Sequence, residues 1–177
     1  MMRKIIEYAL LFVVLVLLQI FLFSNLELSV YLNPLIYIAF IILLPIETMP
    51  VLVLGLGLLT GVVMDVATGA AGLNTLATLP VAFLRGGLLR LTCSKDSVTD
   101  GGVPSVYRLG VLGFVRYVVA AVVMHSLIYF TMECATFDYF HLTLLRVVVS
   151  GAVTVAIVYF ASKIFNSQVA RVLYFNN

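Results

Sequence analysis

Six stretches of this chain are apolar enough to cross a lipid bilayer, and only short polar strips separate them. At roughly 20 residues for each crossing, six helices take up about 120 residues, so little of the 177-residue chain is left for a soluble domain. Charged residues form only 10% of the chain, whereas a typical soluble domain has about 25%. The sequence therefore predicts an all-α integral membrane protein with a single transmembrane domain over residues 1–177.

The expected helices follow from the apolar runs and from the glycines and prolines between them. Pro34 and Pro50 fit the first turn of a helix, where the missing N–H has no cost. Pro80 predicts a kink inside its helix. The second and third spans are short, so a re-entrant hairpin is an alternative to two full crossings. The six predicted helices cover residues 5–23, 31–46, 50–66, 73–91, 109–130 and 141–164.

The basic residues indicate which ends of these helices face the cytoplasm, because arginine and lysine are concentrated in cytoplasmic loops. If the N-terminus is cytoplasmic, the three outward loops have no arginine or lysine and carry only Glu27, Glu133 and Asp138. We therefore expect a multi-pass protein of the cytoplasmic (inner) membrane with both termini in the cytoplasm. The basic residues at or near the inner face are then Arg3, Lys4, Arg90, Lys95, Arg108, Lys163 and Arg171.

Four charged residues lie well within the predicted spans, where an unpaired charge costs roughly 2.5–3.5 kcal/mol or more. Asp65 and Arg146 reach a similar depth in the outer part of the bilayer, so we expect them to form a buried ion pair or to line a polar site. Arg85 lies near the inner interface, where Glu47 is its expected partner. The fourth residue is Arg116. Arginine side chains in such positions can also extend to lipid headgroups.

Gly57 and Gly61 stand four residues apart on one face of the third span. Small residues at this spacing let two helix backbones approach closely inside a membrane. A single pair of this kind is weak evidence for dimerisation. Packing within one bundle is therefore the preferred interpretation.

The chain contains no sequence pattern typical of catalysis or of metal binding. His125 and His141 are the only histidines, and they do not form His-Glu-x-x-His; a Walker A loop and a Gly-x-Ser-x-Gly elbow are also missing. We expect His125 to be packed or interfacial. Cys93 and Cys134 fall in segments predicted to lie on opposite sides of the bilayer, so a disulfide is not expected. We therefore expect no enzyme activity, no cofactor and no metal, and the net charge of +2 gives no reason to expect nucleic-acid binding.

The segment from about residue 33 to residue 85 carries the most specific pattern in the chain. It combines a proline-bounded second span, spaced glycines and an aspartate in the third span, a glycine turn, and an arginine near the end of the fourth span. In order, it contains Asn33-Pro34-Leu35-Ile36-Tyr37, Leu43-Leu44-Pro45-Ile46-Glu47, Pro50, Gly57-x-x-x-Gly61-x-x-x-Asp65, Gly72-Leu73-Asn74 and Ala82-Phe83-Leu84-Arg85.

This pattern resembles the signature of the rod shape-determining MreD family, and the chain length, the six spans and the cytoplasmic termini fit that family as well. The family often has histidine where Asn74 stands and proline near Gly86. The resemblance implies a six-transmembrane-helix bundle similar to the substrate-binding subunits of energy-coupling-factor transporters. It also implies a non-catalytic subunit of the bacterial cell-elongation complex. Such a subunit binds MreC and helps couple MreB filaments to peptidoglycan synthesis by RodA and a penicillin-binding transpeptidase.

Two other functions remain as alternatives. A small-molecule binding subunit of an energy-coupling-factor transporter usually has Ala-x-x-x-Ala in its first helix, but the first span here has only Ala9. An ion or proton channel needs more polar residues along its pore than this chain has. The candidates for helix packing or for a partner interface, in a protein surrounded by membrane lipid, are Gly57, Gly61, Asp65, Gly72, Asn74, Arg85 and Arg146.

Overall fold

The computed structural model describes residues 2–23, 32–134 and 140–174. In these ranges every regular element is helical and no strand occurs. Three helices of the described chain are long and apolar enough to cross a membrane: α3 (Pro50–Thr68), α6 (Val106–Cys134) and the part Phe140–Ile164 of α7 (Phe140–Tyr174). Their length and composition indicate an all-helical protein that associates with a membrane.

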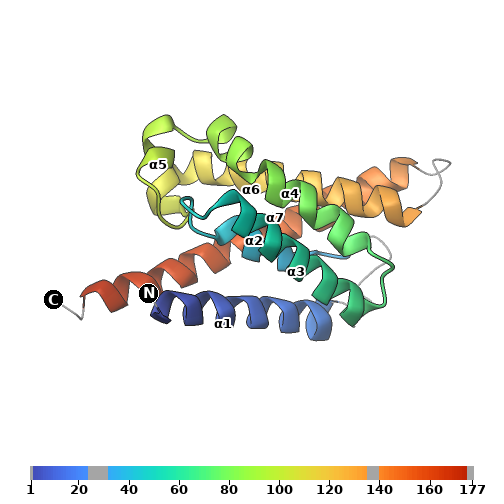
Figure 1. Cartoon of the computed structure of the whole chain (residues 1–177). Helices are drawn as coiled ribbons and strands as arrows, with labels where there is room; N and C mark the ends of the chain where they lie inside the picture. Colours follow the sequence, from blue (N-terminus) through green and yellow to red (C-terminus); the bar gives the residue numbers. More distant parts are fainter. Residues whose placement is uncertain (1, 24–31, 135–139, 175–177) are drawn as a thin grey trace.

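The long helices run roughly along one direction, so the molecule has two ends (Figure 1). The first, which we name the α5 end, contains α5 (Lys95–Thr99) and the beginnings of α1 (Met2–Leu18) and α6. The second, the Gly72 end, contains the turn between α3 and α4 (Leu73–Thr92), the end of α6 and the beginning of α7. Helix α1 continues toward the Gly72 end in a π-helical stretch, η1 (Gln19–Phe23).

The predicted helix 31–46 is wrong in its extent, and residues 24–31 lie outside the described ranges. Residues 32–35 are not helical; a 3-10 turn, η2 (Ile36–Ile38), then leads directly into α2 (Ala39–Leu43). Helix α2 ends where Leu44 takes extended backbone angles. The cause is Pro45, because the ring of a proline disfavours the helical conformation of the preceding residue. We name residues 32–48 the central segment.

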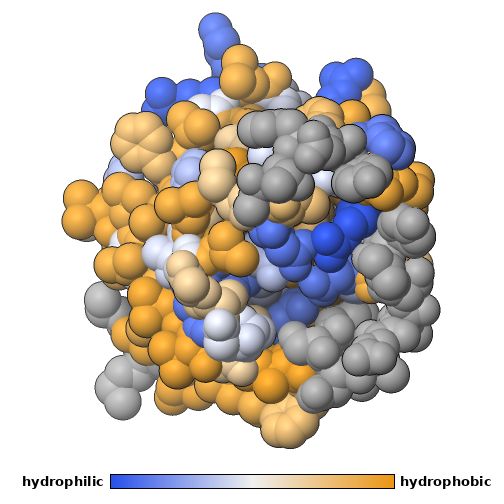
Figure 2. Space-filling model, turned by 90° about the vertical axis from the view of Figure 1, so that its right-hand side faces the viewer, coloured by the Kyte–Doolittle hydropathy of each residue, from blue (hydrophilic) through white to orange (hydrophobic). Residues whose placement is uncertain are grey.

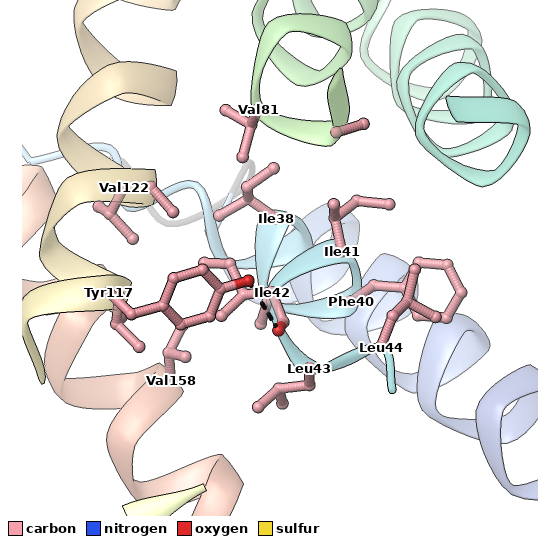
Figure 3. Close-up of a cluster of buried hydrophobic side chains, with 14 of the residues drawn as sticks. Ile38, Phe40, Ile41, Ile42, Leu43, Leu44, Val81, Tyr117, Val122 and Val158 are labelled. Atoms are coloured by element: carbon pink, nitrogen blue, oxygen red, sulfur yellow. Dashed lines mark hydrogen bonds between the residues drawn. The ribbon is translucent and has the colours of Figure 1, made fainter. Parts of the chain in front are cut away.

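The central segment fills the middle of the bundle. Every side chain from Leu35 to Leu44 is at most 4% exposed. In Figure 3 the side chains of Ile38 and of residues 40–44 lie among Val81 of α4, Tyr117 and Val122 of α6, and Val158 of α7. A helix that is apolar on all sides is stable only where it is surrounded by other elements. The short, uniformly apolar run therefore forms the core and not a surface helix.

The other helices agree closely with the predicted spans. The third and fourth predicted helices, 50–66 and 73–91, correspond to α3 and α4, and α4 runs through Pro80 as one helix. Helix α6 begins before the predicted residue 109, but its helical geometry is interrupted at Gly110. Helix α7 continues beyond the predicted end at 164.

The connector between α5 and α6 is hydrogen-bonded to the end of the central segment. The N–H of Ile46 donates to the carbonyl of Gly102 (2.8 Å), and the N–H of Gly102 donates to the carboxylate of Glu47 (2.6 Å). Arg108 donates from Nη1 to the carbonyl of Asp100 at 3.1 Å. The polar connector therefore closes the α5 end over the central segment.

Candidate functional site

Gly57 and Gly61 lie on the face of α3 that packs against α4. A Cβ atom added at Gly61 would lie 2.4 Å from the Cα of Thr75, and one added at Gly57 would lie 2.7 Å from the Cβ of Ala82. Carbon atoms in van der Waals contact are about 3.5–4.0 Å apart, so only glycine fits at either position. The close approach predicted from the glycine spacing is confirmed, and it joins two helices of the same chain. We name this contact the α3–α4 seam.

Asp65, one turn after Gly61, caps the first turn of α4. Its Oδ1 accepts a hydrogen bond from the backbone N–H of Asn74 (2.8 Å). Its Oδ2 accepts from the backbone N–H (3.1 Å) and from the hydroxyl (2.6 Å) of Thr75. These backbone N–H groups have no partner within their own helix, and a negative charge is favourable at a helix N-terminus. A carboxylate of one helix thus serves as the N-terminal cap of the next.

The turn between the two helices explains why the cap comes from another helix. The residue at the N-cap position of α4 is Gly72, which has φ 88° and no side chain to accept a hydrogen bond. Gly69 ends α3 with φ 67°, and its N–H donates to the carbonyl of Asp65. Glycine adopts positive φ values without steric cost. The two glycines therefore make a tight turn that brings the start of α4 to the Asp65 carboxylate.

A chain of buried polar groups begins at Asp65 and crosses the middle of the bundle. Asn74 donates from Nδ2 to Oδ1 of Asp65 at 3.0 Å. The hydroxyl of Tyr37 donates to Oδ1 of Asn74 at 2.9 Å, and it lies 3.0 Å from Nε2 of His125. The hydroxyl of Thr78 lies 3.4 Å from the same nitrogen. The chain joins α3, α4, the central segment and α6, and its last four residues are at most 2% exposed.

Side chains from α1 and α7 bind the backbone at the beginning of the central segment. The N–H groups there are not part of a regular helix, so each needs a partner when it is buried. Amide and hydroxyl oxygens supply these partners. The pairs are Asn33 N–H with Ser150 Oγ (3.0 Å), Leu35 N–H with Thr154 Oγ1 (3.2 Å) and Ile36 N–H with Gln19 Oε1 (2.7 Å).

The other end of α2 is held in the same way, by side chains of α1, α4 and α6. The last carbonyl groups of a helix have no partner within it, and a positive charge is favourable at this end. Figure 3 shows one of these bonds, between Tyr117 and Ile42. The donors are Tyr117 to the carbonyl of Ile42 (3.2 Å), Tyr8 to that of Leu43 (3.4 Å), and Arg85 to those of Leu44 and Pro45 (3.3 Å for Pro45).

Arg85 was expected to meet Glu47, but its guanidinium donates to backbone carbonyls at the end of α2. Arg85 is 4% exposed and directs its guanidinium at the carbonyls of Leu44 and Pro45, whereas Glu47 accepts from the N–H of Gly102. Arg85 and Glu47 both lie at the same end of the central segment, as their spacing predicts. The break in α2 leaves carbonyl groups without a partner in the helix, and these groups bind the guanidinium.

The expected pair between Asp65 and Arg146 is wrong. Arg146 forms a salt bridge with Glu133, with 2.7 Å between Nη1 and Oε2, and its guanidinium lies 4.7 Å from the ring centroid of Phe130. Asp65 is occupied by the first turn of α4. Position along a helix predicts depth, but it does not predict which neighbour the side chain faces. Both groups belong to the Gly72 end, where hydrophilic residues gather near the middle (Figure 2).

The two cysteines are free thiols at opposite ends of the bundle, as expected. Cys93 follows α4 at the α5 end, with Sγ 3.6 Å from the carbonyl oxygen of Gly113. Burial raises the pKa of the Cys93 thiol, so its thiolate fraction at neutral pH is lower than that of an exposed cysteine. Cys134 lies with Sγ 3.0 Å from Oγ1 of Thr143.

Sequence reasoning missed the polar residues that hold the central segment, and it did not assign a partner to His125. A signal was present: Gln19, Ser150 and Thr154 are polar residues inside apolar spans, and such residues need a partner in a membrane. Ser150 and Thr154 also stand one turn apart on the same face of α7. The pattern indicates that α7 has a polar contact, but it does not show that the partner is the backbone of residues 33–35.

The chemistry of these groups is that of holding backbone and side chains in place. In the described ranges, no group of three or more His, Cys, Asp or Glu side chains is arranged to hold a metal ion. Compared with protein-family models, with curated proteins and with solved structures, the chain gives no match.

Proposed function

We propose that this chain is a member of the rod shape-determining MreD family and a non-catalytic subunit of the bacterial cell-elongation complex. It binds MreC directly, and MreB, RodA and a penicillin-binding transpeptidase are further members of the complex. The residues that carry the resemblance have structural roles in the fold, and these roles support the proposal. Gly57 and Gly61 form the seam, Asp65 and Gly72 form the capped turn, and Asn74 and Arg85 bind the central segment or its neighbours.

The observation that carries the proposal is the filled centre of the bundle. The side chains from Leu35 to Leu44 are at most 4% exposed, and side chains of the surrounding helices bind the backbone at both ends. A channel needs an open path through this region, and a binding subunit needs a concave space for its ligand. A scaffold needs a rigid body, and each of these hydrogen bonds adds about 1 kcal/mol to its stability.

We further propose six membrane crossings, with α1, the central segment and α4 added to the three long apolar helices. Hydrogen bonds place the start of the central segment beside Gln19 and its end beside Tyr8. These two residues are about 16 Å apart along α1 at 1.5 Å per residue, so residues 36–43 cover about half of the hydrocarbon thickness, and the proposed crossing also requires the residues that flank them in the sequence. The resulting arrangement is a bundle like the substrate-binding subunits of energy-coupling-factor transporters.

The α5 end is proposed to face the cytoplasm, together with both termini. Arg90, Lys95 and Arg108 belong to this end, whereas Asp65 and Glu133 belong to the Gly72 end. Basic residues favour the cytoplasmic side in membrane proteins. The protein is then a multi-pass protein of the bacterial cytoplasmic membrane.

The surface that binds MreC is proposed to lie away from the seam. Gly57 and Gly61 are covered by α4, so a substitution there would change the bundle before it changed an interface. The outward faces of the helices are exposed and apolar, and a helix of MreC would pack against one of them.

A crosslinking experiment tests this binding. A photoreactive amino acid of leucine size is placed, one position at a time, at exposed sites on five helices, and crosslinks to MreC are scored in cells. The buried Ile41 (0% exposed) is the control. We expect MreC to co-purify and to crosslink from sites on one side of the bundle; no co-purification and no crosslink from any site would refute the proposal. The exposed sites are Leu10, Leu59, Phe83, Val123 and Val148.

The alternative is a small-molecule binding subunit of a transporter, and the hydrophilic cluster at the Gly72 end favours it (Figure 2). Native mass spectrometry of the purified protein distinguishes the two functions. A stoichiometric small molecule, together with co-purification of an ATPase of the transporter type, would support transport. Co-purification of MreC without such a molecule supports the scaffold.

A further inference from the structure

In the buried polar chain that starts at Asp65, the donor and the acceptor of each hydrogen bond can be assigned. The assignment begins at the Asp65 carboxylate. Four donors surround this carboxylate: the backbone N–H groups of Asn74 and Thr75, the amide of Asn74 and the hydroxyl of Thr75. Hydrogen bonds of this kind stabilise the ionised form, which can only accept. The atom of Asn74 that faces Asp65 must therefore be the NH₂ nitrogen, and Oδ1 of Asn74 must face the hydroxyl of Tyr37.

Thr68 supports the same orientation of the Asn74 amide. The hydroxyl proton of Thr68 is donated to the carbonyl of Met64 at 2.7 Å. Its oxygen is then an acceptor, and it lies 3.3 Å from Nδ2 of Asn74. Asp65 and Thr68 therefore both present acceptors to the same side of the Asn74 amide, so the amide nitrogen must face them and the amide oxygen must face Tyr37.

The direction continues to His125 through two hydroxyl groups. Tyr37 gives its proton to Oδ1 of Asn74 (2.9 Å), and Thr78 gives its proton to the backbone carbonyl of Asn74 (2.7 Å). Both hydroxyl oxygens therefore turn lone pairs toward Nε2 of His125, at 3.0 Å and 3.4 Å. A nitrogen that faces two acceptors must carry the proton.

The other ring nitrogen of His125 completes the assignment. Nδ1 is buried and has no hydrogen-bond partner among the described residues. A second proton on this nitrogen would create a charged ring with an unsatisfied N–H in the core, which is costly. A neutral ring with its proton on Nε2 donates toward the two hydroxyl oxygens and leaves no buried N–H without a partner at Nδ1.

We infer that His125 is locked as the neutral Nε2–H tautomer by a directed chain of hydrogen bonds from Asp65 through Asn74 and Tyr37. The lock joins four elements, and its state is set by the position of the central segment. A movement that takes the Tyr37 hydroxyl away from Nε2 removes the nearer acceptor, at 3.0 Å, and leaves only the Thr78 hydroxyl at 3.4 Å. His125 is thus a built-in reporter of whether the central segment is seated, whichever protein binds the bundle.

Nitrogen-15 NMR of the full chain in detergent micelles tests this inference, because ring nitrogens with and without a proton have well-separated shifts. A His141→Gln variant identifies the signals of His125. We expect Nε2 to have the shift of a protonated nitrogen and Nδ1 that of an unprotonated one. A proton on Nδ1, whether alone or together with one on Nε2, would overturn the assignment in the wild-type protein itself.

Two hydroxyl deletions test the chain. In Tyr37→Phe the Nε2 shift should change because its nearer acceptor, at 3.0 Å, is removed, whereas Nδ1, which has no partner among the described residues, should keep the shift of an unprotonated nitrogen. Tyr117→Phe is the matched control: it also removes a buried tyrosine hydroxyl, but that hydroxyl binds the carbonyl of Ile42 and does not belong to the chain. Unchanged His125 shifts in folded Tyr37→Phe protein would refute the lock.

Discussion

Replacing Gly61 by alanine adds a single methyl group at the tightest point of the α3–α4 seam. The new Cβ atom would lie 2.4 Å from the Cα of Thr75 and 2.9 Å from its backbone nitrogen. These are backbone atoms, so no side-chain rotation relieves the clash, and carbon atoms need about 3.5 Å or more. The two helices must therefore separate by about 1 Å. We expect overpacking to cost about 1–3 kcal/mol and the loosened Asp65 cap to cost about 0.5–2 kcal/mol.

Gly55→Ala is the matched control on the same helix. Gly55 is exposed, and nothing lies within 4 Å of a Cβ atom added there. Alanine is a better helix former than glycine by about 1 kcal/mol, so this variant should be as stable as the wild type or slightly more stable. The free energy of unfolding is measured in mixed micelles as the fraction of sodium dodecyl sulfate is increased, with helix content followed by circular dichroism.

The gain in helix propensity is the same in both variants, so the expected difference is about 1.5–5 kcal/mol, with Gly61→Ala the less stable. Equal stabilities, within about 0.5 kcal/mol, would show that the two backbones do not approach at Gly61. The structural role assigned to Asp65 would then fail as well, because its hydrogen bonds to Asn74 and Thr75 require the same approach.

Three further outcomes are expected. Gly57→Ala should destabilise the bundle because its Cβ meets that of Ala82 at 2.7 Å, and Ala82→Gly in the same chain should recover most of the loss; an additive double variant would contradict the contact. Arg85→Leu leaves two carbonyls of the central segment without a donor and should lower the free energy of unfolding by about 2–3 kcal/mol. The control is Arg90→Leu at an exposed position of α4, which should change the free energy of unfolding by less than about 0.5 kcal/mol. In a chain without its native thiols, Thr99→Cys should react with a membrane-impermeant maleimide only after the cells are permeabilised; labelling of intact cells would reverse the proposed orientation.

The α3–α4 unit is the part of the candidate site that could be predicted best. The glycine spacing indicated close packing of α3, and the turn after Thr68 was expected from its glycines. Asp65 and Asn74 are only nine residues apart, so a short turn between consecutive helices leaves few ways to arrange them. The cap itself was not predicted, because the face that Asp65 presents depends on how the turn closes.

The remaining contacts join residues that are far apart in the chain. Asn33 meets Ser150 across 117 residues, and Tyr37 meets His125 across 88. Hydropathy gives the depth of such residues, but not the angular position of their helices around the central segment. For the same reason the predicted pair of Asp65 with Arg146 was wrong, and Arg85 binds backbone carbonyls that the sequence did not indicate.

The sequence alone therefore determined the helical class, the membrane association and most helix bounds, because apolar run length and helix-breaking residues act locally. Only the tertiary structure decided that the second span is a short buried core segment, and which side chains hold it. Burying a helix this short leaves N–H groups and carbonyls without partners at both ends. Their partners come from wherever the folded bundle brings a hydroxyl, amide or guanidinium within reach, and no local pattern encodes that.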